Sequence, residues 1–146
     1  MLSDVSQPSL KADITSLNLN LATPKKLNIT LQVKNPTKKD MTIWQCGFWP
    51  NHSLAMFDSK GNAVTRTTNG SNLQAIFEDT RRGRDKNFSV LIAPGKSYRY
   101  MVAECALNNL FILHPGKYSL TIEYWEKTVK DQPRMKTAPI SVTVAR

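Results

Sequence analysis

Cysteine and histidine are the residues of this chain best suited to nucleophilic or metal chemistry, and the sequence contains two of each. His52 and His114 each stand in a predicted turn, and neither has the helical spacing to a second ligand that zinc motifs require. Cys46 lies close to His52, but Gly47 and Pro50 intervene, so the sequence sets no geometry for a nucleophile and its base. We therefore expect no catalytic residue, no metal site and no cofactor.

The cysteines Cys46 and Cys105 each follow the end of a predicted strand. They are either a disulfide pair or two buried thiols that behave as small hydrophobic residues. A bridge needs Cα atoms within about 7 Å of each other and an oxidising compartment. Residues 1–8 lack the basic stretch and apolar run of a signal peptide, which leaves a cytoplasmic protein or a mature exported one. The cysteine pair and the Asn- and Thr-rich composition favour export, to the periplasm or the extracellular space.

The densest run of charge spans residues 78–86 and contains Arg81, Arg82 and Arg84. As a loop, these arginines could grip a carboxylate or phosphate, because guanidinium groups form bidentate hydrogen bonds with both. The alternative is a solvated hairpin loop with internal Arg–Asp pairs. The spacing of a calcium loop, a phosphate-binding loop or a dinucleotide fingerprint does not occur in the sequence.

Three large aromatic rings, Trp44, Phe48 and Trp49, flank Cys46. Sandwich folds often bury one strand tryptophan between their sheets, and Trp44 is the candidate for that place. Phe48 and Trp49 would then cap the end of the sandwich, or form an exposed platform for sugar rings or a protein partner. They are, with the three arginines, the candidate binding residues.

The net charge of +9 favours an acidic protein partner or an anionic surface. Lysine and arginine are scattered over many segments and no nucleic-acid-binding motif occurs, so we do not expect nucleic-acid binding. No stretch approaches the roughly 20 apolar residues of a membrane helix.

The length of 146 residues suits one domain, residues 1–146, in which 1–9 are expected to be a flexible N-terminal segment. Alternation of apolar and polar residues is clearest in Leu27–Lys34 and Lys117–Trp125, and it predicts half-buried strands, the second of them central. The residues expected in the core are Ile29, Leu31, Val33, Tyr118, Leu120 and Ile122.

Further strands are expected where the same alternation recurs between turn signals. These are Phe88–Ile92 and Ile140–Val144, with weaker candidates at Lys11–Leu21, Met41–Gln45, Leu54–Phe57, Ala63–Arg66 and Ser97–Ala103. Helical turns are expected at Leu73–Glu78 and Ala106–Phe111. Without any strand–helix–strand repeat, eight or nine short strands indicate an all-β sandwich.

The turns occur in a recognisable order between Leu27 and Trp125: Asn35-Pro36-Thr37, Asp58-Ser59-Lys60-Gly61, Pro94-Gly95 and Pro115-Gly116. This succession resembles the immunoglobulin-like β-sandwiches typified by the bacterial intracellular proteinase inhibitor family and by many uncharacterised bacterial exported domains. The resemblance implies an all-β, immunoglobulin-like antiparallel β-sandwich of about eight strands, a fold that hosts many unrelated functions.

The function expected from these observations is a non-enzymatic binding or interaction domain that acts through protein or surface contact. One alternative is a carbohydrate-binding module that uses Phe48 and Trp49. The other is a proteinase inhibitor, which rests on the family resemblance alone.

Overall fold

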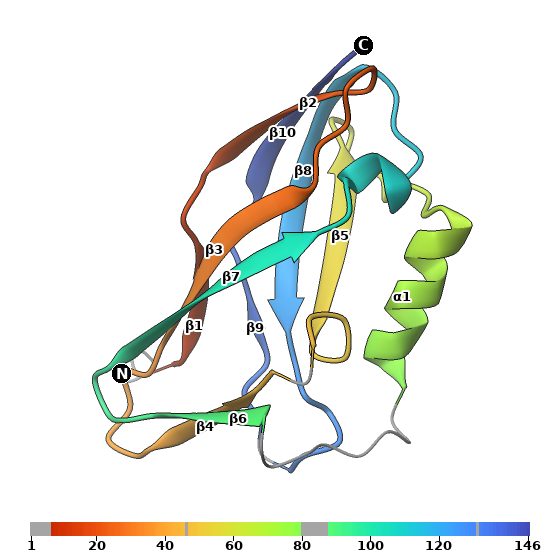
Figure 1. Cartoon of the computed structure of the whole chain (residues 1–146). Coiled ribbons are helices and arrows are strands. Elements are labelled where there is room, and N and C mark those ends of the chain that lie inside the picture. Colours follow the sequence, from red (N-terminus) through yellow and green to blue (C-terminus); the bar gives the residue numbers. More distant parts are fainter. Residues whose placement is uncertain (1–6, 46, 80–87, 131) are drawn as a thin grey trace.

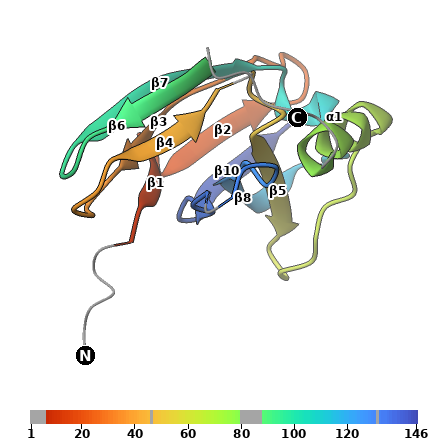
Figure 2. The same ribbon diagram turned by 90° about the horizontal axis from the view of Figure 1, so that it is seen from below.

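The computed structural model describes residues 7–45, 47–79, 88–130 and 132–146, and it is a β-sandwich flanked by one helix (Figure 1). The first sheet has the order β1–β3–β7, with β1 at Ser9–Ala12, β3 at Leu27–Lys34 and β7 at Ser97–Glu104. The second has the order β2–β10–β8–β5, with β2 at Ser16–Asn20, β10 at Ile140–Ala145, β8 at Gly116–Tyr124 and β5 at His52–Asp58. Figure 2 shows these two sheets as separate layers.

Three smaller pieces complete the fold. A two-stranded sheet joins β4, Met41–Trp44, to β6, Ser89–Ile92, and the short strand β9, Met135–Lys136, pairs with the end of β8. The helix α1 spans Thr68–Glu78, and the 3-10 turn η3 spans Leu107–Asn109. The pairs are antiparallel except that of β2 with β10, which is parallel.

The expected all-β antiparallel sandwich is confirmed, and β8 lies centrally between β10 and β5. The described residues form ten strands instead of about eight. One reason is that the predicted strand Lys11–Leu21 is two strands in different sheets. The Asp13 carboxylate accepts a hydrogen bond from the Thr30 amide, after which the chain leaves the first sheet and pairs with β10 from Ser16.

Two other local predictions are wrong. Ala63–Arg66 is not a strand, because this segment crosses from β5 to α1 and pairs only through isolated bridges of Ala63 with Phe57 and Arg66 with Phe111. His52 does not lie in a turn but begins β5, where its side chain is 1% exposed.

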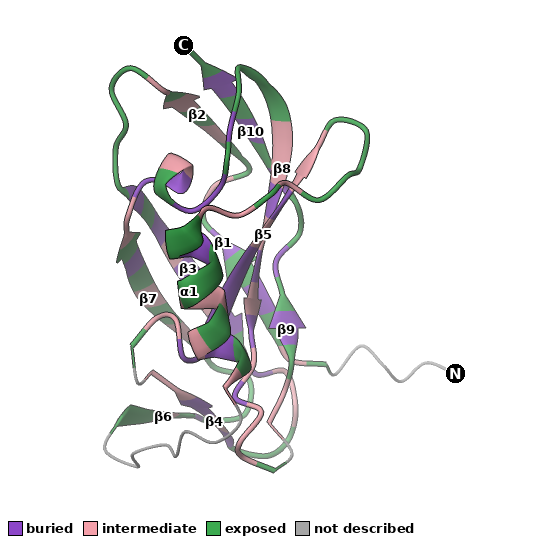
Figure 3. Ribbon diagram, turned by 90° about the vertical axis from the view of Figure 1, so that its right-hand side faces the viewer, coloured by how far each residue is buried: buried purple, intermediate pink, exposed green. Residues whose placement is uncertain are grey.

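The core lies between the two sheets, as the burial colouring of Figure 3 shows. Five of the six predicted core residues are at most 2% exposed: Ile29, Leu31, Val33, Leu120 and Ile122. Tyr118 is only half-buried, and its hydroxyl accepts a hydrogen bond from the His114 amide at 3.1 Å and donates one to the His114 carbonyl at 3.0 Å.

The helix α1 begins earlier than predicted, because Thr67 caps it. The Thr67 hydroxyl accepts a hydrogen bond from the Gly70 amide at 3.0 Å and donates one to the Asn109 carbonyl at 2.7 Å. The Thr67 amide also donates to the Leu110 carbonyl at 2.9 Å. These bonds hold the first turn of α1 directly against the segment that contains η3.

Replacing Gly70 with alanine is expected to destabilise the protein by about 1–3 kcal/mol, as overpacking does. A glycine-to-alanine change inside a helix ordinarily stabilises it, by about 1 kcal/mol. Here the added Cβ would lie 2.0 Å from the Leu110 carbonyl oxygen, which cannot move without losing its bond to Thr67. Urea unfolding of Gly70→Ala, with the exposed Ser71→Ala as control, measures the effect. A more stable Gly70→Ala would show that the helix does not pack this closely.

Candidate functional site

Two hollows, one beside β4 and one beside β7, are lined in part by the segment of residues 41–45 and 47–52. We call them the β4 groove and the β7 cleft after the strand that each follows. The segment contains all three aromatic residues that the sequence singled out, and it contributes side chains to both hollows.

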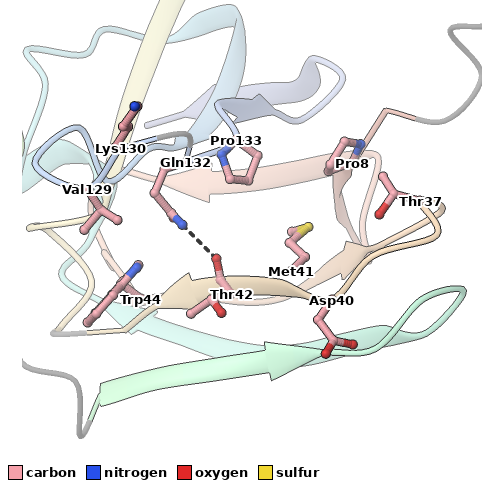
Figure 4. Close-up of a pocket in the computed structure, with 10 residues that line it drawn as sticks. All are labelled: Pro8, Thr37, Asp40, Met41, Thr42, Trp44, Val129, Lys130, Gln132 and Pro133. Carbon is pink, nitrogen blue, oxygen red and sulfur yellow. Dashed lines mark hydrogen bonds between the residues drawn. The ribbon is translucent and has the colours of Figure 1, made fainter.

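The β4 groove has a volume of about 610 Å³. It lies between β4 and the chain that connects β8 to β9 (Figure 4). Its lining residues are Pro8, Thr37, Asp40, Met41, Thr42, Trp44, Val129, Lys130, Gln132 and Pro133. The lining therefore combines apolar and polar side chains.

The edge of β4 that faces the groove is held by side chains instead of by a neighbouring strand. The Trp44 amide donates to the Tyr124 hydroxyl at 2.8 Å, and this hydroxyl donates to Gln132 Oε1 at 2.7 Å. Gln132 Nε2 then donates to the Thr42 carbonyl at 2.9 Å. The side-chain amide of Gln132 thus takes the place that the peptide group of another strand would have.

Trp44 is not the core tryptophan that the sequence suggested. Met41 and Ile43 point into the core, so Trp44, like Thr42, lies on the opposite face of the strand and lines the groove. The Trp44 indole nitrogen is buried and has no hydrogen-bond partner among the described residues. Leu91, directly across from Thr42 on β6, is 66% exposed on the same face.

The β7 cleft has a volume of about 470 Å³ and follows the outer edge of β7. Its lining residues are Gln45, Gly47, Phe48, His52, Tyr100, Met101, Val102, Ala103 and Glu104. Phe48 stacks on His52 with ring centroids 4.5 Å apart, and Trp49 meets Phe48 edge to face at 4.9 Å. Trp49 Nε1 donates to Glu104 Oε1 at 2.6 Å.

His52 has both ring nitrogens engaged. Nδ1 lies 2.9 Å from the Phe48 carbonyl, which can only accept, so Nδ1 carries the proton and donates. Nε2 therefore accepts from the Tyr100 hydroxyl at 2.6 Å. Burial lowers the pKa of His52 to about 4, against a smaller opposing effect of the Phe48 hydrogen bond, so the ring is neutral near pH 7.

The pKa values of two other groups near the cleft, Tyr100 and Cys105, are shifted in the direction that favours their neutral forms. Burial, and to a lesser degree the neighbouring Tyr124 and Tyr98, raises the pKa of the Tyr100 phenol. Burial and the nearby Glu104 raise the pKa of the Cys105 thiol, which disfavours the nucleophilic thiolate. Among the described residues, no group of three or more His, Cys, Asp or Glu side chains is placed to hold a metal ion.

The structure brings together Phe48 and Trp49, both partly buried against the core. Arg81, Arg82 and Arg84 lie outside the described residues, so their role as an anion-binding loop stays a prediction. Cys46 lies outside them too. The Cys105 side chain is partly buried, and the choice between a Cys46–Cys105 bridge and two separate thiols stays open.

Sequence reasoning missed the side-chain cap on β4. Tyr124 belongs to a predicted strand, but nothing in the sequence connects Gln132 to Thr42, which lies 90 positions away. The contact between His52 and Tyr100 spans 48 positions and was missed as well.

No protein-family model matches the sequence, and neither does any curated protein. Three solved structures illustrate the similar folds. The E. coli chaperone DraB is 12% identical with a TM-score of 0.39, over 94% of this chain and 54% of that one. A PapD-like domain of human CEP192 is 12% identical with a TM-score of 0.40, over 99% and 89%. A β-glucosidase from Listeria innocua is 11% identical with a TM-score of 0.45, over 97% and 16%.

The chain thus spans about half of the chaperone and a small part of the glucosidase. Within the ranges that the structure describes, no helix is both long enough and apolar enough to cross a membrane.

Proposed function

We propose that this chain is a non-enzymatic interaction domain that binds an extended segment of a protein partner in the β4 groove. The observation that carries the proposal is the edge of β4, where Gln132 and Tyr124 hold the backbone groups of Thr42 and Trp44. An incoming strand can replace these side-chain hydrogen bonds with main-chain ones. Strand addition of this kind derives affinity from the backbone and specificity from the pockets for alternate side chains.

The walls of the groove supply such pockets. Trp44 offers a large ring, and the exposed Leu91 extends the apolar surface on the same face. Pro8 and Pro133 add rigid apolar contacts that have little conformational entropy to lose. Buried aromatic residues are the usual centres of binding energy in protein interfaces. We therefore assign the main specificity contact to Trp44.

Replacing Trp44 with alanine is expected to weaken peptide binding at least about tenfold, because a central aromatic contact is worth more than about 1.4 kcal/mol. Peptides selected from a random library on the immobilised domain would be titrated against wild type and Trp44→Ala by calorimetry. Ile112→Ala serves as control, since Ile112 is 50% exposed outside the groove. Equal affinities for all three proteins, or failure to select any peptide, would refute the proposal.

A carbohydrate-binding module is the second candidate, at the β7 cleft. The cleft combines the Phe48 ring with the Gln45 amide and the Glu104 carboxylate, and sugar sites pair an aromatic face with such polar groups. Binding on a glycan array that is lost in both Phe48→Ala and Trp49→Ala would support it.

The proteinase-inhibitor hypothesis rests on the resemblance of the sequence, and a panel of serine and metalloproteinases tests it directly.

Export to the periplasm or the extracellular space is part of the proposal of an interaction domain, because an exported domain can carry the Cys46–Cys105 bridge.

A further inference from the structure

We propose that the outer face of the β1–β3–β7 sheet carries a binding site for a tetrahedral oxyanion, a phosphate or sulfate group, between Lys11 and Arg99. A hollow of about 250 Å³ lies there and shares no lining residue with the β4 groove or the β7 cleft. It is lined by Lys11, Ala12, Asp13, Thr30, Gln32 and Arg99. The site is independent of the proposed peptide groove, with which it shares no lining residue.

The strand register places the two cations in one row across the sheet. Lys11 of β1 is directly opposite Gln32 of β3, and Gln32 is directly opposite Arg99 of β7. Directly opposite residues share a face, and strands are spaced about 4.8 Å apart, so the Cα atoms of Lys11 and Arg99 are about 10 Å apart. Both side chains are long enough to converge on one anion above Gln32.

These polar side chains are available for a ligand. Within the described parts of the chain, the side chains of Lys11, Gln32 and Arg99 make no ion pair or hydrogen bond. Arg66 and Arg134, by contrast, are used internally, by the Leu54 carbonyl and the Glu123 carboxylate respectively. The row therefore presents a lysine, an amide and a guanidinium group that point to no partner in the protein.

The charge of the hollow sets the class of ligand. A phosphate group carries about −1.5 to −2 charges near pH 7 and accepts a bidentate hydrogen bond from arginine, which matches two cations. The Asp13 carboxylate, which accepts from the Thr30 amide at 3.1 Å, also lines the hollow and opposes the anion. Removing that charge should consequently tighten binding. The sheet register thus brings together Lys11 and Arg99, which lie far apart in the sequence.

The test is an amide chemical-shift titration of the full chain, in which sodium phosphate replaces sodium chloride while the ionic strength stays constant. We expect saturable shifts centred on Thr30–Gln32 and on Arg99. Lys11→Gln and Arg99→Gln should each weaken the affinity about three- to tenfold, the range for partly screened charged contacts. Asp13→Asn, which keeps an oxygen for the Thr30 amide, should strengthen it. Sulfate and acetate provide the two comparison arms.

Lys117→Gln is the matched control, because Lys117 is an exposed lysine on β8 of the other sheet. The proposal is overturned if phosphate causes no saturable shift, or if Lys117→Gln weakens binding as much as Lys11→Gln does. It is overturned as well if Asp13→Asn weakens binding, or if acetate binds as tightly as phosphate. Each variant is compared only if its spectrum is well dispersed, as a folded protein requires, so that a loss of binding is not attributable to unfolding.

Discussion

Replacing Leu31 or Leu120 with alanine is expected to lower the free energy of unfolding by about 2–5 kcal/mol, the range for fully buried leucines. Both side chains are 0% exposed. Leu31 lies in β3 of one sheet and Leu120 in β8 of the other, so each substitution leaves a cavity between the two layers. Since small domains are stable by only about 5–15 kcal/mol, either change removes a large part of the total.

Urea unfolding of the two variants measures the effect. Leu91→Ala is the matched control, because Leu91 is a leucine of the same size that is 66% exposed on β6. Its change should stay within about 0.5 kcal/mol, as for surface substitutions generally. A loss below about 1 kcal/mol at both Leu31 and Leu120 would mean that the two sheets do not pack as described.

The folded protein is expected to lose about 2–3 kcal/mol of stability between about pH 7.5 and pH 4.5 through His52 alone. The pKa of His52 is about 4 in the folded protein, against 6.5 for an ordinary histidine. Between these two values the unfolded chain binds a proton that the folded protein does not. The contribution of His52 is therefore fully present above pH 6.5 and is lost as the pH falls towards 4.

Carboxylates also titrate at the acid end of this window, so a comparison with a variant that has no histidine at position 52 is needed. His52→Gln keeps one donor and one acceptor for the Phe48 carbonyl and the Tyr100 hydroxyl but does not titrate. Urea unfolding of wild type and His52→Gln at about pH 7.5 and pH 4.5 measures the effect. The free energy of unfolding should fall clearly less for the variant than for wild type. If His52→Gln loses as much as wild type, the imidazole is not buried in its neutral form.

The strands with one buried face could be predicted from the sequence. Leu27–Lys34 alternates through its whole length because every second residue enters the core, and β3 has the predicted bounds. The break in Lys11–Leu21 was not predictable in this way, because it depends on the contact of Asp13 with Thr30, a residue on another strand. Alternation gives the period of a strand, but it does not show where the strand changes partner.

The candidate site shows the same limit. The density of aromatic residues draws attention to the segment from Trp44 to Trp49, and its described residues do contribute to the lining of both hollows. The sequence nevertheless favours Trp44 as the core tryptophan, since sequence alone does not show which face of a four-residue strand is covered. The partners that complete the groove and the cleft, Gln132 and Tyr100, come from distant parts of the chain.

The proposed strand addition at β4 is tested most directly by intermolecular nuclear Overhauser effects between the labelled domain and a peptide selected on it. The account predicts contacts from the peptide backbone to Thr42 and Trp44, in the alternating pattern of a paired strand. It also predicts a change at the Gln132 side-chain amide as its hydrogen bond to the Thr42 carbonyl is replaced. Peptide contacts that gather at Phe48 and Met101 in the β7 cleft, with Thr42 and Gln132 unchanged, would contradict it.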